Sequence, residues 1–272
     1  MGRGVGQQST AASGRRDRVV VVLPTYNECE NIRSLLDAIF DQTGRIGDAE
    51  LSVLVVDDQS PDGTGGLVRE YAGGNPHVRL LGDARKRGLG MAYKRAMAHA
   101  LEEMGADVVF EMDADFSHDP NDIPRLLARA RNGHDFVIGS RYVAGGSIPT
   151  EWSALRRAAS RWGNVLARYI AGLRAVRDCT SGFRAIKADV LRQIALDGLD
   201  ATGYVFQIRL LHEALAKGAK VSEIPIAFAD RVRGESKLGL RDVAEFMVKG
   251  FFIRFSRDRT KKPSLHAGAT AR

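Results

Sequence analysis

The chain has 272 residues, of which 44% are hydrophobic, and this is enough to bury a full core as one domain. Its formal net charge of +7 leaves three classes of partner open: nucleic acid, an anionic membrane surface, or a phosphorylated substrate. We expect no nucleic-acid partner, because the chain has no aromatic-rich binding motif, zinc spacing or basic helix of the usual kinds.

Both ends of the chain differ in composition from the middle. Residues 1–17 are rich in Gly, Ser, Gln and Arg without apolar periodicity, and residues 257–272 are basic and then small and polar. Such segments predict disordered tails around one folded domain over residues 18–256. The first tail has no apolar stretch that could serve as a signal peptide, and Cys29 and Cys179 are too few for a disulfide framework. A reduced, cytosolic environment fits both observations.

Strand and helix patterns alternate along the first half of the chain. Apolar, mostly β-branched runs predict five strands, at residues 19–23, 51–56, 78–81, 106–112 and 135–139. Stretches with helical spacing separate the first four of them, at residues 32–40, 64–71 and 88–104. This alternation predicts an α/β fold, in which helices flank a mostly parallel, doubly wound central sheet. No G-x-G-x-x-G motif follows the first strand, so an ordinary dinucleotide-binding fold is disfavoured.

The second half of the chain is expected to add a long helix, a strand-like piece after a polar turn at residues 178–184, and a further strand. Residues 152–173 predict the helix, in which Arg156 and Ser160 are four positions apart and share one face. Residues 221–228 predict the strand, and Pro225 within it indicates the edge of a sheet or a bulge.

The last part of the predicted domain combines basic and aromatic residues. Residues 230–239 form a glycine-containing loop with alternating cations, which suits either a clamp over phosphate or a solvated connection. Residues 240–256 predict a helix that is far shorter than the ~20 continuous apolar residues needed to span a bilayer. Two interpretations of this helix stay open: it lies on an anionic membrane surface, or it packs on the core of the domain.

A pair of carboxylates, Asp113 and Asp115, ends the apolar run at 106–112. Side chains one residue apart on an extended segment point the same way, so the two carboxylates are expected to face together. Like charges so placed are costly unless a cation lies between them, and carboxylate oxygens suit Mg²⁺ or Mn²⁺. The alternative is a solvated turn that caps the next helix at Asp119 or Asn121.

Polar or conformationally restricted residues follow several of the predicted strands. Pro24, Asp58, Asp113 and Arg141 each lie just past the expected carboxyl end of a strand. Open α/β sheets bind ligands in the crevice outside this edge. We therefore expect one ligand site there.

Eight short motifs together resemble a known family. Four are similar to motifs of the family-2, GT-A-type nucleotide-sugar glycosyltransferases, which have a Rossmann-like single domain: VVLPTYNE (21–28), VVDDQSPDGT (55–64), KRGLG (86–90) and MDAD (112–115). Four more are similar to motifs of the dolichol-phosphate (polyprenyl-phosphate) mannose synthases: GSRY (139–142), SGFR (181–184), GYVFQ (203–207) and DRVRGESKLG (230–239). The resemblance covers about residues 19–255.

The resemblance implies inverting transfer of mannose from GDP-mannose to a polyprenyl (dolichyl-type) phosphate, for lipid-linked glycan synthesis and protein mannosylation. It also implies Mg²⁺ or Mn²⁺ as the cofactor. The residues implied to hold the guanosine part of the donor are Pro24, Tyr26, Glu28, Val56 and Asp58, with Asp57 nearby. Those implied to hold the metal and the diphosphate are Asp113, the Ala114 backbone and Asp115.

The resemblance also assigns phosphate contacts. Arg141, Arg231 and Lys237 would contact phosphates, and Arg156 and Ser160 would join Arg141 around the acceptor phosphate. The residues implied to be catalytic are Asp115, Arg141, Arg156 and Ser160. Two positions depart from the family pattern: Ser117 stands where some relatives carry Gln, and Arg209 stands where many carry Glu.

The residue inventory itself favours a phosphate acceptor. An inverting transferase that acts on a sugar hydroxyl needs a general base, but the corresponding segment, Phe206 and Gln207, has no carboxylate. A phosphate monoester has its second pKa near ~6, so it can attack without losing a proton. Its difficulty is repulsion from the donor diphosphate, about 4 kcal/mol for unit charges 4 Å apart at an effective dielectric of ~20. A metal ion and several cations offset that repulsion.

Other functions remain as alternatives. The nearest is a polyprenyl-phosphate glucosyltransferase that uses UDP-glucose, and the non-enzymatic one is a basic membrane or nucleic-acid adaptor that retains the fold. A nucleotidyltransferase would usually open with a Gly-rich phosphate loop after the first strand, which is missing here. The acceptor's tail lies in the bilayer, so we expect peripheral binding at the cytoplasmic face, strengthened by a separate integral membrane partner.

Overall fold

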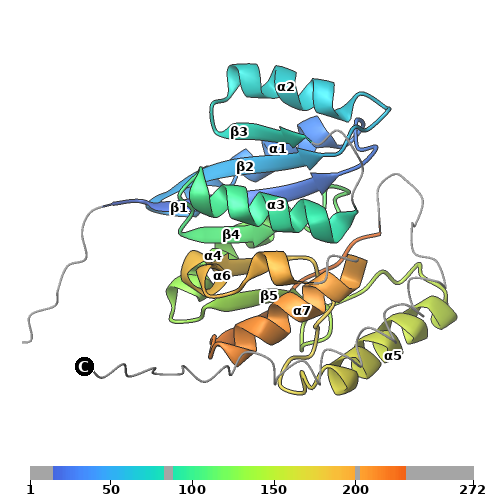
Figure 1. The fold of residues 1–272 in the computed structure, drawn as a ribbon. Coiled ribbons are helices and arrows are strands. Elements are labelled where there is room, and N and C mark those ends of the chain that lie inside the picture. The colour runs from blue at the N-terminus through green and yellow to red at the C-terminus, as the bar shows by residue number, and fades with distance from the viewer. Residues whose placement is uncertain (1–14, 83–87, 200–202, 231–272) are drawn as a thin grey trace, which may run out of the picture.

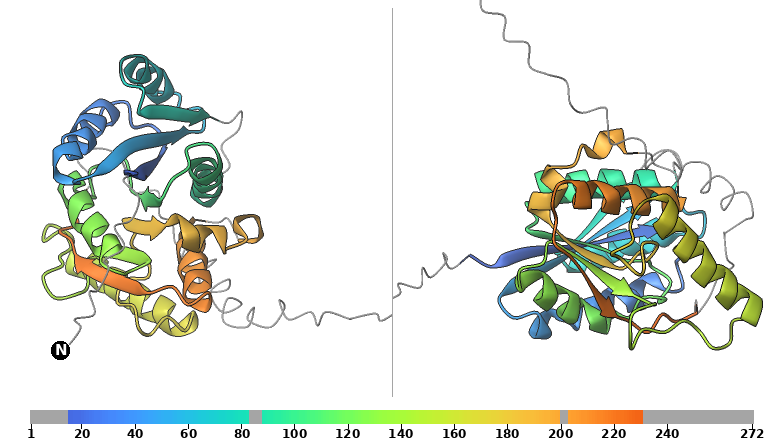
Figure 2. Two further views of the ribbon diagram at one scale, coloured as in Figure 1. Left: turned by 90° about the vertical axis from the view of Figure 1, so that its left-hand side faces the viewer. Right: turned by 90° about the horizontal axis from the view of Figure 1, so that it is seen from below.

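A computed structural model describes residues 15–82, 88–199 and 203–230 of the chain. In this part of the chain, helices cover both faces of one seven-stranded sheet (Figure 1, Figure 2). The strands are β1 (Asp17–Thr25), β2 (Ala49–Asp57), β3 (Val78–Gly82), β4 (Val108–Glu111), β5 (Phe136–Ser140), β6 (Arg184–Lys187) and β7 (Val221–Pro225). The helices are α1 (Ile32–Phe40), α2 (Thr64–Gly74), α3 (Leu89–Glu102), α4 (Ile123–Arg131), α5 (Ala154–Ile170), α6 (Ala188–Arg192) and α7 (Gly203–Ala216).

The order of the strands confirms the predicted fold class. They lie in the order β3-β2-β1-β4-β6-β5-β7, and every strand except β6 runs in the same direction. The sheet is therefore mostly parallel, as expected, and the five strands predicted in the first half are all present. Because β1, β2, β4 and β5 are parallel, the loops that follow them leave from one edge of the sheet.

Two hydrophobic cores, one on each face, hold the helices to the sheet. Side chains of β1 alternate between them, as the period of two requires. Val20 and Val22 pack in the core that α3, α6 and α7 cover, and Val19 and Val21 pack in the core that α1, α2 and α4 cover. Strands buried on both faces explain the nearly continuous apolar runs in the sequence.

Several boundaries differ from the prediction. β1 begins at Asp17, the last residue of the segment expected to be a tail, and Pro24 lies inside β1 rather than past its end. β7 is at the edge of the sheet, as Pro225 indicated, but it ends at this proline instead of continuing to residue 228. The loop after Asp230, the helix expected over residues 240–256 and the tail at 257–272 lie outside the described residues. None of the helices in the described ranges is long and apolar enough to cross a membrane.

The short strand β6 places an ion pair in the middle of the sheet. It lies between β4 and β5, antiparallel to both, and its first residue, Arg184, pairs in register with Glu111. Both side chains are fully buried, and their charged groups are 3.6 Å apart. Burial raises the pKa of Glu111 to about 7, although the charge of Arg184 acts in the opposite direction. The Arg184 guanidinium also donates to the backbone carbonyls of Gln207 (2.8 Å) and Cys179 (2.9 Å).

Replacing Arg184 with Met is expected to lower the free energy of unfolding by about 3–5 kcal/mol, because it leaves a buried carboxylate without its partner. The double variant Glu111→Leu/Arg184→Met removes both charges and should recover much of this loss. Urea unfolding of the wild type, both single variants and the double variant measures the coupling. Strictly additive losses would show that the two side chains do not stabilise each other.

Candidate active site

The loops after β1 and β2 are tied to each other at the carboxyl edge of the sheet. Three backbone N–H groups of the first loop donate to side chains of the second: Asn27 to Ser60 Oγ (3.0 Å), Glu28 to Thr64 Oγ1 (2.9 Å) and Cys29 to Asp62 Oδ2 (3.0 Å). Burial acts to raise the pKa of Asp62, but hydrogen bonds from Thr64 and Cys29 outweigh it and lower the pKa to about 2. The two loops therefore form one rigid rim.

Asp57, the last residue of β2, and Asp58, which follows it, make different contacts. The buried Asp57 carboxylate accepts hydrogen bonds from both the backbone N–H (3.2 Å) and the hydroxyl of Ser60. Gly65 lies so close that a Cβ there would be 2.8 Å from Asp57 Oδ2. Asp58 instead accepts a hydrogen bond from Arg95 Nη1 at 3.0 Å. Asp57 thus supports the loop from within, and Asp58 is joined to α3.

The other residues implied to bind the nucleoside lie at the same edge. Pro24, Tyr26 and Glu28 are partly exposed, and the Glu28 carboxylate accepts a hydrogen bond from Asn31 Nδ2 at 2.9 Å. Val56 is buried, with its side chain in the hydrophobic core. Any ligand contact at this position therefore involves the Val56 backbone.

Asp113 and Asp115 lie in the loop after β4 and differ in exposure. The Asp113 side chain is 37% exposed, whereas Asp115 is buried. Asp115 Oδ1 accepts hydrogen bonds from the Ser117 backbone N–H (3.0 Å) and the Ser117 hydroxyl (2.6 Å). Ser117, one of the two departures from the family pattern, therefore orients the Asp115 carboxylate directly. The Ala114 side chain is buried as well.

His118 fixes the backbone at Asp113. Its Nδ1 accepts a hydrogen bond from the Asp113 backbone N–H at 3.1 Å, and its ring stacks on Phe183 with centroids 5.1 Å apart. Burial lowers the pKa of His118, which favours the neutral ring that this acceptor role requires. Gly182 lies beside the Asp113 carboxylate, where an added Cβ would be 3.4 Å from Oδ1. The absence of a side chain at Gly182 leaves that space next to Asp113.

Backbone strain is concentrated in these same three loops. Within the described ranges, the non-glycine residues with positive φ are Asn27 (60°), Gln59 (58°) and Phe116 (60°), one in each loop after β1, β2 and β4. The left-handed conformation is costly for residues with a bulky side chain, above all for Phe116. Such residues cluster at binding and catalytic sites. Their positions support one functional site at this edge.

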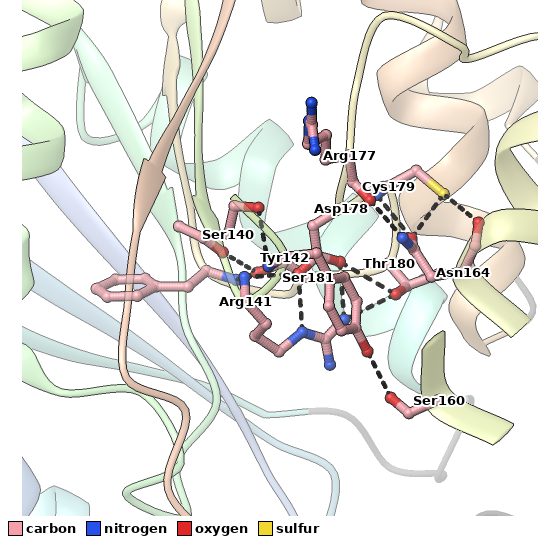
Figure 3. A network of polar contacts seen from close by, with 12 residues as sticks. Ser140, Arg141, Tyr142, Ser160, Asn164, Arg177, Asp178, Cys179, Thr180 and Ser181 are labelled. Carbon is pink, nitrogen blue, oxygen red and sulfur yellow. Dashed lines mark hydrogen bonds and ion pairs between the residues drawn. The ribbon is translucent and has the colours of Figure 1, made fainter. Parts of the chain in front are cut away.

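Arg141, which follows β5, is held by a buried carboxylate (Figure 3). Asp178 accepts hydrogen bonds from Arg141 Nε and Nη2, both at 2.8 Å, and from the Arg141 backbone N–H at 3.0 Å. Nη2 also donates to Thr180 Oγ1 at 2.8 Å. Burial alone would raise the pKa of Asp178, but the charge and hydrogen bonds of Arg141 hold it below its ordinary value. The backbone N–H of Asp178 in turn donates to Glu223 Oε1 on β7, at 2.8 Å.

The helix α5 reaches this group through two side chains. The Ser160 hydroxyl is 2.6 Å from the hydroxyl of Tyr142, the residue after Arg141 (Figure 3). Arg156 lies over the ring of Trp152 at 3.9 Å, and its Nη2 is 3.6 Å from Asp230 Oδ1.

Phe228 connects these groups to the loop of Asp113. Its ring is an edge-to-face neighbour of His118 (5.5 Å between centroids) and of Trp152 (6.0 Å), and the Arg141 guanidinium lies 5.4 Å from its centre. Phe228 thus links the loop of Asp113, through His118, to Arg141 and, through Trp152, to Arg156, whereas Ser160 joins the same region through Tyr142. Arg231 and Lys237, the two other expected phosphate ligands, lie outside the described residues.

The helix α7 carries Gln207 and Arg209, two of the positions singled out in the sequence. Gln207 is buried, and its backbone carbonyl accepts a hydrogen bond from Arg184. Arg209, the second departure from the family pattern, is 3.5 Å from Glu213 one helical turn later. Both positions therefore have structural partners within the described protein.

The two carboxylates after β4 fit a hard divalent cation that is shared with a ligand. The described ranges contain no group of three or more His, Cys, Asp or Glu side chains able to hold a metal ion. Mg²⁺ is commonly bound by one or two carboxylates together with substrate phosphates and water. Asp113 and Asp115, with the space beside Gly182, match that mode of binding.

The family model described as Glycosyl transferase family 2 matches residues 20–195. A polyprenol monophosphomannose synthase of Mycolicibacterium smegmatis is 40% identical over 235 residues, which cover 85% of this chain and 85% of the relative. An undecaprenyl-phosphate mannosyltransferase of Micrococcus luteus is 42% identical over 233 residues, which cover 85% of this chain and 91% of the relative. The resemblance to polyprenyl-phosphate mannose synthases is thereby confirmed.

Solved structures of other glycosyltransferases share the fold. Glucosyl-3-phosphoglycerate synthase from Mycobacterium tuberculosis, in complex with Mn²⁺, UDP and glucosyl-3-phosphoglycerate, has a TM-score of 0.61 at 22% identity, covering 89% of this chain and 80% of that one. Mannosyltransferase PcManGT from Pyrobaculum calidifontis, in complex with GDP-Man and Mn²⁺, has a TM-score of 0.55 at 22% identity, covering 89% and 64%. At 22% sequence identity, this structural similarity establishes the GT-A-like fold of the chain.

The Arg141–Asp178 pair gives a testable stability effect. Replacing Asp178 with Asn should lower the free energy of unfolding by about 1.5–3 kcal/mol near pH 7, because it weakens hydrogen bonds to a charged group. Folding lowers the pKa of Asp178, so the ionised carboxylate stabilises the folded protein. This contribution to the free energy of unfolding is complete above the ordinary carboxyl pKa and is lost as the pH falls through the lower pKa of the folded state. The difference in free energy of unfolding between wild type and variant should thus be constant from pH 5 to 8 and shrink in stronger acid.

Thr180→Val, which removes one hydrogen bond to Arg141, is the control and should lower the free energy of unfolding by less. A pH-independent difference would contradict the assignment.

Proposed function

The chain belongs to glycosyltransferase family 2, and on that premise we propose that it transfers mannose from GDP-mannose to a polyprenyl phosphate, with inversion at the anomeric carbon. The observation that carries the proposal is the chain of contacts through Phe228, which links the Asp113 loop to Arg141 and, through Trp152, to Arg156, with Ser160 joined to Tyr142 next to Arg141. The names of the two bacterial relatives support the acceptor. The mannosyltransferase complex with GDP-Man and Mn²⁺ supports the donor and a divalent metal.

The donor would lie across the edge formed by β1, β2 and β4. Tyr26, Glu28 and Asp58 on the rigid rim would contact the guanosine, with the backbone of Val56 behind it. Asp113 and Asp115 would hold Mg²⁺ or Mn²⁺ against the diphosphate, and this cation would neutralise charge on the departing GDP.

The acceptor phosphate would bind between Arg141 on one side and Arg156 and Ser160 on the other. One of its oxygens forms a bond to C1 of mannose while the bond from C1 to the GDP oxygen breaks, and GDP leaves with the electron pair. No proton has to be removed, because the phosphate is already mostly dianionic at neutral pH. A buried Gln207 in place of a carboxylate is consistent with this chemistry.

The place of the reaction follows from the two substrates. GDP-mannose is water-soluble, whereas the polyprenyl tail lies in the bilayer, so we place the enzyme on the cytoplasmic face of the membrane. A separate integral membrane protein would strengthen this attachment.

Transfer of labelled mannose from GDP-mannose to polyprenyl phosphate, followed as organic-soluble product, tests the proposal. Asp113→Ala and Asp115→Ala should each reduce transfer by at least about 100-fold, because removal of either carboxylate weakens metal binding and leaves the leaving group's charge uncompensated. EDTA should abolish the wild-type activity, and Mg²⁺ or Mn²⁺ should restore it.

Asp119→Ala is the matched control for these two variants. Asp119 is an exposed carboxylate of the same loop, and it accepts a hydrogen bond from the Asn121 backbone N–H at 2.9 Å. This variant should retain near wild-type transfer. Full activity in EDTA would rule out the metal assignment, and product from UDP-glucose but not from GDP-mannose would establish the glucosyltransferase alternative.

The acceptor assignment predicts a separation of two measurements. Arg156→Ala and Ser160→Ala should each raise the KM for polyprenyl phosphate by about tenfold or more, the equivalent of one hydrogen bond to a charged group. Calorimetric affinity for GDP should stay within about twofold of wild type, because neither side chain belongs to the donor edge. Arg157→Ala is the control, since Arg157 Nη1 donates to the Thr150 carbonyl at 3.1 Å instead. A large fall in GDP affinity with an unchanged acceptor KM would reverse the assignment.

A further inference from the structure

The start of α5 holds Arg156 by both its backbone and its side chain. Ser153 caps the helix, and its hydroxyl accepts a hydrogen bond from the Arg156 backbone N–H at 3.2 Å. Trp152, the residue before the cap, has the Arg156 guanidinium over its ring, with Cζ 3.9 Å from the centre of the ring. An arginine expected at the acceptor phosphate is therefore fixed at two points by its neighbours in the sequence.

Arg141 and Arg156 are held by different kinds of interaction. Asp178 and Thr180 accept hydrogen bonds from Nε and Nη2 of Arg141, so these donors are used inside the protein. The ring of Trp152 instead attracts the charge of Arg156 electrostatically, and this contact needs no hydrogen-bond acceptor. The ring thus holds Arg156 in place without taking up its N–H donors, which a phosphate group can then use.

Asp230 is a second neighbour of Arg156, but this ion pair is open to solvent. The charged atoms are 3.6 Å apart, and the two side chains are 47% and 46% exposed. Exposed ion pairs contribute little to stability, because water screens them and the long side chains lose entropy when they are fixed. A dianionic phosphate can therefore replace Asp230 beside Arg156 while the cation stays in contact with Trp152.

Phe228 fixes the position of the Trp152 ring relative to the rest of the site. The two rings meet edge to face, with their centroids 6.0 Å apart. The backbone next to Phe228 is itself held, because the N–H of Ala229 donates to the carbonyl of Ser117 at 3.1 Å. Since Ser117 also orients the Asp115 carboxylate, Trp152 leans on a residue that is tied to the carboxylate loop.

We propose that Trp152 is a positioning residue for the transfer reaction and that it presents Arg156 to the acceptor phosphate. This inference rests on the proposed function and deepens it. The face of the ring supports the cation, and the contact with Phe228 sets where Arg156 lies relative to Arg141, so that two arginines reach one phosphate group. Within the described ranges, the buried indole N–H of Trp152 has no hydrogen-bond partner, so the ring acts through its apolar surface.

Steady-state kinetics with GDP-mannose and a short, water-soluble prenyl phosphate tests the proposal on the full chain. Trp152→Leu should raise the KM for the prenyl phosphate about three- to tenfold and leave kcat little changed, because the cation–π contact that orients Arg156 is lost. Trp152→Phe should recover most of this loss, since a phenyl ring also offers a face to the guanidinium. The affinity for GDP, measured by calorimetry, should remain that of the wild type in both variants.

A double-variant cycle distinguishes positioning through Arg156 from a general effect on the fold. In an Arg156→Ala background, Trp152→Leu should change the KM for the prenyl phosphate by less than about twofold, because the side chain that it positions is gone. Trp162→Leu, at the exposed tryptophan of the same helix, is the matched control and should keep the wild-type KM in this assay without a bilayer.

Two results of these kinetics would overturn the proposal. One is an equal effect of Trp152→Leu with and without Arg156, which would show that the ring does not act through this arginine. The other is a higher KM for GDP-mannose with an unchanged KM for the acceptor, which would place Trp152 against the sugar donor.

Tryptophan fluorescence tests the same contact without a substitution at Trp152. The chain has two tryptophans, so Trp162→Phe leaves Trp152 as the reporter. Binding of the prenyl phosphate without donor should change its emission, because the cation over the ring exchanges Asp230 for phosphate, and adding Arg156→Ala should abolish this change. Unchanged emission when calorimetry shows bound prenyl phosphate, or a change that persists with Arg156→Ala, would overturn the proposal.

The two kinds of measurement separate this inference from the proposed function. A change of Trp152 emission that depends on Arg156, without any transfer of mannose by the wild type, would refute the proposed function and leave the role of Trp152 at the phosphate in place. Transfer by the wild type, with the same acceptor KM in Trp152→Leu, would refute the positioning role alone.

Discussion

The buried pair of Glu111 and Arg184 connects the two halves of the site. Glu111 ends β4 two residues before Asp113, and Arg184 begins the antiparallel strand that lies against it. The same guanidinium donates to the carbonyl of Cys179, the residue after Asp178, which holds Arg141. Separating a buried ion pair leaves an uncompensated charge inside the protein, which costs several kcal/mol of stability. A shift of β4 or β6 alone would separate Glu111 from Arg184 and is therefore disfavoured. The relative position of the Asp113 loop and Arg141 is therefore set from inside the sheet.

Of the arginines expected at the acceptor phosphate, the two in the described ranges both lie next to a carboxylate. Arg141 is bound in two places to Asp178, and Arg156 is 3.6 Å from Asp230. Such arginines add little net charge, but they are oriented before any ligand binds, and oriented donors need no reorganisation during the reaction. Under the proposed function, the excess positive charge that two phosphate groups require would then come from a cation at Asp113 and Asp115 and from residues such as Arg231 and Lys237. This division would explain why a site rich in arginine also uses a metal.

Local patterns in the sequence were sufficient for the parallel part of the fold. Runs of apolar residues located β1 to β5 because strands buried on both faces need them, and the carboxyl ends of parallel strands placed Asp58, Asp113 and Arg141 at one edge. The antiparallel direction of β6 depends on pairing with residues far away in the chain, and no local pattern encodes it. The role of Asp178 was missed for the same reason, since its partner is 37 positions away. His118 and Phe228 were missed because aromatic contacts between loops leave no spacing signal.

The helix α5 bears on the proposed acceptor, a lipid phosphate rather than a soluble sugar. A lipid's tail fixes the depth of its phosphate, and a helix lying in the interface fixes the depth of the side chains on its flanks. When both are set by the same bilayer, the acceptor needs few further contacts to be placed against C1 of the donor, and much of the entropy cost of positioning is met before the reactants meet. A soluble acceptor would instead require a pocket that encloses it. The exposed apolar side chains of α5, Leu155, Trp162, Leu166 and Tyr169, suit the first arrangement, while Ser160 faces the protein and contacts Tyr142.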